Sequence, residues 1–212
     1  MTKFASTYSA LVGALGVDPT VRIAMATDPA LIEATFADFD AAESADAFLD
    51  FHGRACPASL VELLALPDTV DLVWRSSDAA GEFHLTNPYG GASRHPDASY
   101  GMVAGHDIVA FSILDQVTDI AGPWFVLYDI MEVDEAGLLL FDGRSIAPLA
   151  LTPSDYAELS LAAAGCDSWA FLFADFPLAQ DRRTAIARSV AKVRELVPGA
   201  AIERLATLSG NS

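Results

Sequence analysis

The residues of this chain whose spacing could support catalysis are its histidines and their acidic neighbours. Glu82 and His84 are two residues apart, so they would share one face of a strand, and Asp97 follows His95 at the same interval in a loop. An acid–imidazole pair of this kind can act as a general base. Its commoner role is a cross-strand contact at the surface. A small hydrolase that used either pair would require these side chains to converge in one pocket.

Other catalytic and metal-binding patterns are missing from the sequence. It contains no His-x-x-x-His pair, no Gly-x-Ser-x-Gly elbow and no glycine-rich phosphate loop. Its two cysteines, Cys56 and Cys166, are too few for a disulfide framework or a four-thiolate metal site. A helix that starts at Pro57 could activate Cys56, but a small buried thiol is the commoner case. We therefore expect no metal, no cofactor and no enzymatic activity.

The charge of the chain favours a basic protein partner. Among 212 residues, 29 are acidic and 12 basic, for a net charge of −17. This field repels phosphate backbones, so we expect no binding of nucleic acid, whereas it speeds encounter with a basic surface. Solubility alone would also explain such a surface. No apolar run approaches the ~18 residues of a membrane span, and the N-terminus lacks the apolar core of a signal peptide. We therefore expect a cytoplasmic protein without a membrane partner.

The acidic residues are concentrated in one segment. Residues 28–50 contain seven carboxylates and neither Lys nor Arg. A second candidate contact region is the loop 87–99, which is rich in Gly and Pro. The residues that we select as candidates for partner binding are Asp38, Asp40, Glu43, Asp46 and Asp50 from the acidic segment, and Arg94 and Asp97 from the loop.

Helical patterns dominate the first part of the chain. Apolar residues recur at three- and four-residue intervals over 8–15, and Asp28-Pro29 is a cap and first-turn pair for a second helix. The buried side of that second helix would consist of Leu31, Ile32 and Phe36. Two further helices are expected at about 42–51 and 57–66. We predict a helical N-terminal region over residues 1–56.

After Pro67-Asp68 the periodicity changes to that of strands. Strands are expected at 70–74, 82–85, 124–130, 137–141 and 146–149. The stretch 109–114 suits either a strand or a short helix.

Two helices are expected near the C-terminus. Thr152 is a suitable N-cap, Pro153 suits the first helical position, and Gly165 can supply a left-handed stop. The closing helix is expected at about 180–196. Helices, then antiparallel strands, then helices predict an α+β fold, with a single antiparallel or mixed sheet flanked by helices and a helical N-terminal extension.

Several of these segments together resemble the SMI1/KNR4 family of the SUKH superfamily. The leucine-rich stretch 57–66 leads into the strand Val-Asp-Leu-Val-Trp at 70–74, and an aromatic strand at 124–128 has its partner at 138–141. The closest match is Leu-Thr-Pro-Ser-Asp-Tyr-Ala-Glu-Leu at 151–159, which is followed by the Trp-containing segment 169–173. Tyr156 is followed by Ala157 where a leucine is usual. The resemblance covers residues 57–176, so we divide the chain into 1–56, a core over 57–176, and a C-terminal helix and tail over 177–212.

The resemblance implies a protein-binding module of α+β fold that is not an enzyme. Bacterial members of the family are mostly associated with immunity to toxins, often nucleases, and fungal members are scaffolding regulators of cell-wall synthesis. We therefore expect an acidic immunity protein that neutralises a basic bacterial toxin. The alternatives are a regulatory or scaffold protein without a toxin partner and, third, a small hydrolase.

Overall fold

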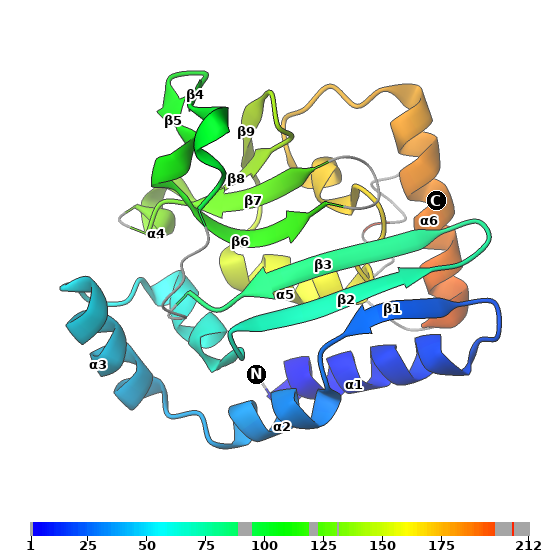
Figure 1. The fold of residues 1–212 in the computed structure, drawn as a ribbon, viewed down its shortest axis with the longest axis horizontal. Coiled ribbons are helices and arrows are strands. Elements are labelled where there is room, and N and C mark those ends of the chain that lie inside the picture. Colours follow the sequence, from blue (N-terminus) through cyan, green and yellow to red (C-terminus); the bar gives the residue numbers. More distant parts are fainter. Residues whose placement is uncertain (1, 89–94, 119–122, 131, 198–204, 206–212) are drawn as a thin grey trace.

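The computed structural model describes residues 2–88, 95–118, 123–130, 132–197 and 205. Figure 1 shows the arrangement of the elements, in which η marks a 3₁₀ helix. In chain order the elements are α1 (Thr2–Val17), β1 (Arg22–Ala26), α2 (Pro29–Ala37), α3 (Ala41–His52), η1 (Ala58–Ala65), β2 (Thr69–Arg75), β3 (Ala80–Thr86), η2 (Ala98–Tyr100), β4 (Met102–Val103), β5 (His106–Asp107), η3 (Ile108–Ala110), β6 (Ser112–Val117), β7 (Trp124–Tyr128), α4 (Val133–Ala136), β8 (Leu138–Phe141), β9 (Ile146–Leu149), α5 (Pro153–Ala162), η4 (Trp169–Phe173) and α6 (Gln180–Leu196). The mixture of helices and antiparallel strands confirms the predicted α+β class. None of the helices described has the length and apolar character that a membrane span needs.

The strands are divided among three hydrogen-bonded sheets where a single sheet was expected. Their orders are β1-β2-β3, β4-β5 and β6-β7-β8-β9, and neighbouring strands in each are antiparallel. The two larger sheets meet edge to edge, because β3 and β6 run side by side (Figure 1). We call this contact the β3–β6 junction. Among the described strands, no ladder of backbone hydrogen bonds joins β3 to β6.

The segment after α5 lies against β3 and occupies part of its edge. α5 begins as predicted, with the hydroxyl of Thr152 accepting a hydrogen bond from the Asp155 N–H at 3.1 Å. Gly165 then has φ 61°, the left-handed conformation that the sequence predicted. Its carbonyl accepts from the Glu82 N–H at 2.8 Å, and the indole N–H of Trp74 donates to the Ala164 carbonyl at 2.7 Å. The first of these bonds satisfies a backbone N–H of β3 that a neighbouring strand would otherwise pair, and the second fixes the segment to a side chain of β2.

The N-terminal region packs on the same core as the rest of the chain. Tyr8 and Leu15 of α1 are fully buried, in one cluster with Trp74 of β2 and Ile186 of α6. The hydroxyl of Tyr8 donates towards the Asp71 carbonyl at 2.7 Å, which fixes α1 against β2. β1 lies within the region that we predicted to be helical, and it extends the first sheet.

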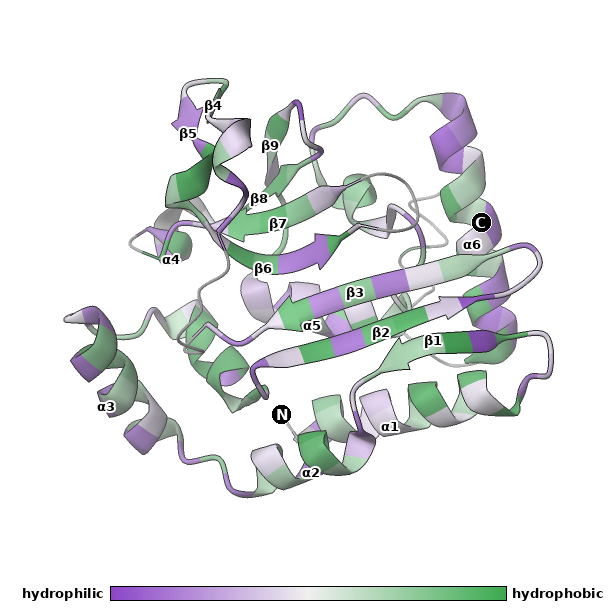
Figure 2. Ribbon diagram, in the orientation of Figure 1, coloured by the Kyte–Doolittle hydropathy of each residue, from purple (hydrophilic) through white to green (hydrophobic). Residues whose placement is uncertain are grey.

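Most of the remaining elements follow the sequence pattern. All five residues of β7 are buried, and α6 spans Gln180–Leu196 as expected. The ambiguous stretch 109–114 divides into the end of η3 and the start of β6. The expected helix at 57–66 is a 3₁₀ helix, η1. In Figure 2 hydrophobic residues lie along β7, whereas β5 is hydrophilic and α6 carries hydrophilic and hydrophobic residues in turn.

Candidate functional site

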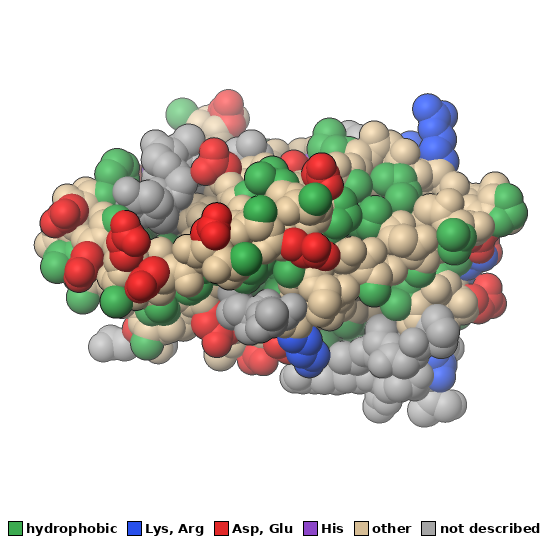
Figure 3. All heavy atoms as spheres, turned by 90° about the horizontal axis from the view of Figure 1, so that it is seen from below, with side chains coloured by type: hydrophobic (Ala, Val, Ile, Leu, Met, Phe, Trp, Pro, Cys, Tyr) green, Lys and Arg blue, Asp and Glu red, His purple; other side chains and the backbone are tan. Residues whose placement is uncertain are grey.

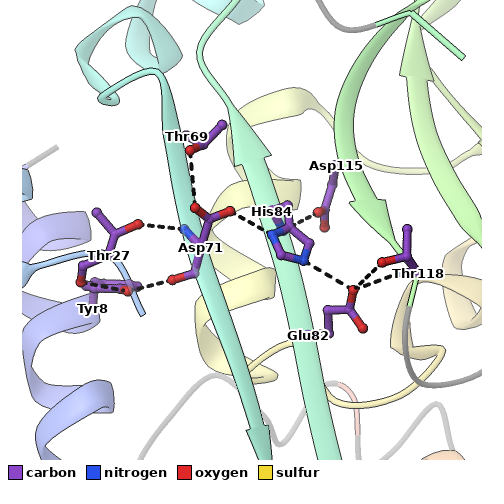
Figure 4. A network of polar contacts seen from close by, with 8 residues as sticks. All are labelled: Tyr8, Thr27, Thr69, Asp71, Glu82, His84, Asp115 and Thr118. Atoms are coloured by element: carbon purple, nitrogen blue, oxygen red, sulfur yellow. Dashed lines mark hydrogen bonds and ion pairs between the residues drawn. The ribbon is translucent and has the colours of Figure 1, made fainter. Parts of the chain in front are cut away.

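A network of polar side chains, several of them titratable, spans the β3–β6 junction (Figure 4). Its centre is His84 on β3, whose Nδ1 lies 2.6 Å from Oδ1 of Asp71 on β2. The other ring nitrogen, Nε2, lies 3.1 Å from Oε1 of Glu82. The register of β2 and β3 sets the first contact, because Asp71 is directly opposite His84. The second contact, between Glu82 and His84, forms because side chains two residues apart on a strand lie on the same face.

Two carboxylates replace the missing backbone ladder between β3 and β6. Asp115 of β6 is fully buried, and its Oδ1 accepts from the backbone N–H of His84 at 2.6 Å. Its Oδ2 accepts from the hydroxyl of Tyr156 on α5, also at 2.6 Å. In the opposite direction, Oε1 of Glu82 accepts from the backbone N–H of Thr118 at 2.8 Å. The β6 register shifts between Ile113 and Asp115, at the position where Asp115 reaches across.

The electrostatics of the network favour a protonated His84. Burial lowers the pKa of the imidazole, but hydrogen bonds to Asp71 and Glu82 and the charges of Asp115 and Asp71 outweigh burial and raise it to about 10. Burial raises the pKa of Asp115 to about 6, against the opposing effect of its bonds to Tyr156 and His84. Burial and the adjacent Asp115 raise the pKa of Tyr156 well above its ordinary value. At neutral pH the network is therefore an imidazolium ion held among carboxylates.

This arrangement does not suit general-base catalysis by His84. A general base needs a free lone pair, and both ring nitrogens of His84 face carboxylates as donors. The predicted pairing of Glu82 with His84 is present, but as part of an ion pair that joins strands.

The second predicted pair, His95 and Asp97, does not form an acid–imidazole contact. Nδ1 of His95 lies 2.8 Å from the Phe111 carbonyl. The carboxylate of Asp97 instead accepts from the Ser99 N–H at 2.8 Å and caps η2. His95 therefore contacts the backbone at Phe111, and Asp97 caps a 3₁₀ helix, so the two side chains have separate structural roles.

The cysteines are not activated. Burial, together with the charge of Asp134, raises the pKa of Cys56 to about 11. Burial also raises the pKa of Cys166, which is fully buried. Because the thiolate is the nucleophilic form, neither residue has the environment of a catalytic cysteine. In the described ranges, no three His, Cys, Asp or Glu side chains are grouped so that they could hold a metal ion.

The candidate carboxylates of the acidic segment are all exposed on α3 and on the connection that precedes it. Asp40 caps α3 by accepting from the N–H groups of Ala42 and Glu43, at 2.8 and 3.1 Å. The five exposed residues are Asp38, Asp40, Glu43, Asp46 and Asp50. Asp97 is also exposed, but it lies at the start of η2 and not on α3. Arg94 falls outside the described residues.

Large apolar side chains are exposed among these carboxylates. Leu31 is 52% exposed, Leu49 44% and Phe51 58%. Leu31 was expected on the buried side of its helix, but Ile32 alone of that set is fully buried, because α2 contacts the core along a narrow stripe. We define the acidic–apolar face as these three residues together with Asp38, Asp40, Glu43, Asp46 and Asp50. Figure 3 shows acidic side chains with hydrophobic ones between them over this part of the molecule.

The sequence pattern contained a signal for one of the exposed apolar residues of α3. In α3, Phe48 is fully buried and anchors the helix, while Leu49 and Phe51 lie one and three residues further on. Leu49 follows Phe48 directly and points about 100° away from it around the helix, so the two cannot both lie at the centre of one buried face. Phe51, at an interval of three, would suit the buried face by spacing alone, so its exposure was not encoded in the pattern.

Comparisons of this chain with protein-family models, with curated proteins and with solved structures gave no match. The resemblance to the SMI1/KNR4 family therefore stays a prediction from the sequence.

Proposed function

We propose that this protein is a non-enzymatic binding module that neutralises a basic protein partner through its acidic–apolar face. The most specific form of this proposal is an immunity protein whose partner is a bacterial toxin, such as a nuclease. The observation that carries it is the mixture of exposed carboxylates and exposed large apolar side chains on one small part of the surface.

The charges of this face suit rapid and selective association. Residues 28–50 contain no Lys or Arg, so the carboxylates of α3 have no basic neighbours on their own segment. A surface of one sign accelerates encounter with a surface of the opposite sign and disfavours partners of like charge. A nuclease is a suitable partner because the cleft that binds phosphate groups must itself be basic.

The apolar residues of this face can contribute close packing against a partner, which charge alone does not provide. Leu31, Leu49 and Phe51 are each exposed by more than two fifths, and large side chains of this kind can fill pockets on a partner. Solubility would explain an acidic surface, but it does not explain apolar side chains placed within it.

The state of His84 supports a non-enzymatic role. Its imidazole is the best-placed candidate base of the chain, and the ion pairs with Asp71 and Glu82 occupy both of its ring nitrogens. A hydrolase would need this lone pair for catalysis.

The experiment that tests the proposal is a pull-down with the tagged protein from a lysate of its own organism, at low and at high salt, with mass spectrometry. We expect a basic partner that is retained at low salt and reduced at high salt, because added ions screen the attraction. The matched variant replaces three carboxylates of α3 by Glu43→Gln, Asp46→Asn and Asp50→Asn. It should lose this partner.

The control variant removes the same number of exposed charges from other elements, by Asp68→Asn, Asp107→Asn and Glu158→Gln. It should retain the partner. Equal loss in both variants would mean that total charge, and not the acidic–apolar face, controls binding. Once a partner is purified, an association rate that does not change with salt would contradict the proposal. A basic partner without toxin activity would favour the scaffold or regulatory alternative.

A further inference from the structure

A hollow lies beside the first turn of α6, away from the network at the β3–β6 junction. Its volume is about 440 Å³, and its lining includes Arg144, from the turn between β8 and β9, and Arg182 of α6. Three aromatic residues, Tyr100, Trp124 and Phe171, also line the hollow. This volume is within the range of about 300–1,000 Å³ that is usual for small-molecule sites.

The hollow continues along the surface. An adjoining space of about 310 Å³ shares Phe171 and Arg182 with it and extends over Phe176 and Leu178. The two spaces together therefore combine guanidinium groups with an apolar floor.

The two arginines are available to an anion. The Arg182 guanidinium lies 4.4 Å from the centre of the Phe171 ring, a contact that fixes its position without using its N–H donors. None of the ion pairs found in the described part of the chain includes Arg144 or Arg182. Guanidinium groups with free donors match carboxylate and phosphate oxygens in geometry as well as charge.

Asp142 lines both spaces, but no ion pair found among the described residues joins it, Asp175 or Asp181 to either arginine. Oδ1 of Asp142 accepts from the backbone N–H groups of Arg144 and Ser145, at 3.0 and 2.7 Å, and so holds the turn. Asp175 lines the adjoining space and is exposed. Asp181 accepts from the backbone N–H of Arg182 at 2.8 Å.

A buried donor at the wall of the hollow also lacks an acceptor. Trp124 lines the hollow and is 2% exposed, and within the described residues its indole N–H has no hydrogen-bond partner. A buried donor without an acceptor is uncommon and costs stability. Because this N–H is buried, the contribution of Trp124 to the hollow is its ring, and the anion is assigned to the arginines alone.

We propose that this hollow binds a small amphipathic anion, with a carboxylate or phosphate group held by Arg144 and Arg182 and an apolar body over Phe171. The chain has only 12 Lys and Arg in 212 residues, and two of these line one aromatic hollow without an ion pair to any described residue. The acidic–apolar face is on other elements, so this site does not depend on the function proposed above.

The test is isothermal titration calorimetry with 2-naphthoate, 2-naphthyl phosphate and the uncharged 2-naphthamide. We expect saturable binding of one molecule of either anion per chain, with the amide at least about tenfold weaker because it cannot form charge-assisted bonds. The relative affinity of the two anions identifies the preferred head group. The variant Arg144→Gln with Arg182→Gln should weaken both anions to the level of the amide.

The matched control is Arg188→Gln, which removes an exposed arginine of the same helix that lines neither space. It should leave the affinity for the anions unchanged. Far-UV circular dichroism and thermal unfolding establish that each variant is folded. Equal affinity for the amide and the anions, an unchanged affinity in the double variant, or no saturable binding of either anion would each overturn the proposal.

Discussion

His84 joins three strands through its charge, and this gives the protein a pH dependence of defined sign. Its pKa is raised from 6.5 to about 10, so the stabilisation by the imidazolium is complete below pH 6.5 and is lost as the pH rises to about 10. We expect the free energy of unfolding of the wild-type protein to fall between pH 7 and 10. Urea denaturation across this range measures it.

The variant His84→Gln isolates this effect. It leaves the buried carboxylate of Glu82 without its imidazolium and should cost about 3 kcal/mol at pH 7, the lower end of the range for a broken buried pair, because His84 is 16% exposed. The variant should also lose the part of the pH dependence described above. A cost that is the same at pH 7 and at pH 10 would show that His84 is neutral in the folded protein.

Tyr156 is the second residue whose single contact can be tested. Its hydroxyl donates to the buried Asp115, and a hydrogen bond to a charged group contributes about 1.5–3 kcal/mol. We expect Tyr156→Phe to destabilise the protein by this amount in urea denaturation at pH 8, above the raised pKa of Asp115. Tyr100→Phe is the matched control, because Tyr100 lines the hollow and its hydroxyl makes no hydrogen bond to another described residue, and it should change stability little.

At this scale the sequence predicted contacts within an element and missed those between elements. The spacing of Glu82 and His84 indicated that they share a face, and their side chains do meet at 3.1 Å. The partners Asp71 and Asp115 come from two other strands, and no local spacing encodes which strand lies opposite. His95 and Asp97 do not meet, because a spacing of two fixes a common face on a strand but not in a loop.

Two glycines decide how closely the segment after α5 can approach β3. A Cβ at Gly81 would overlap the Ala164 carbonyl and the indole of Trp74, which hydrogen-bond to each other. A Cβ at Gly165 would lie 2.6 Å from the Glu82 carbonyl oxygen, and its φ of 61° is itself unfavourable for other residues.

We expect Gly81→Ala to destabilise the protein by about 3 kcal/mol or more, because backbone on both sides must move apart. Gly13→Ala is the matched control, since Gly13 lies within α1 with no atom near its added methyl. That change should stabilise by about 0.5–1 kcal/mol through helix propensity. Thermal unfolding of both variants measures the contrast, and a small effect at Gly81 would contradict the close packing described.

Elements with strong local signals were predicted well and short ones were not. α5 has a cap and a first-turn proline that are used as expected, while its end differs in detail, because Ala164 as well as Gly165 is left-handed after the last helical residue, Ala162. β1 was missed, although Val21, Ile23 and Met25 alternate with other residues between two Asp-Pro pairs. Five residues carry little pattern, and β1 is a strand because β2 offers it an edge.

The net charge of −17 acts on the whole molecule, and its density on α3 should cost stability. Neutralising Glu43, Asp46 and Asp50 relieves repulsion among exposed groups. We expect this variant to unfold at a temperature about 2 °C higher at low salt, which corresponds to less than about 1 kcal/mol. The difference should shrink in high salt, and scanning calorimetry at two ionic strengths measures it. A lower unfolding temperature would show that these carboxylates make contacts that stabilise the fold.

The β3–β6 junction also sets an order of events in folding. Strands β2 and β3, and strands β6 to β9, pair with their neighbours along the chain, whereas the His84–Asp115 bond across the junction joins residues separated by 31 positions. Contacts between distant residues close larger loops and form at a greater cost in chain entropy. The β2–β3 hairpin and the β6–β9 sheet should therefore form before the two meet. In pulsed hydrogen exchange during refolding, the amide of His84 should become protected later than the amides inside these two ladders.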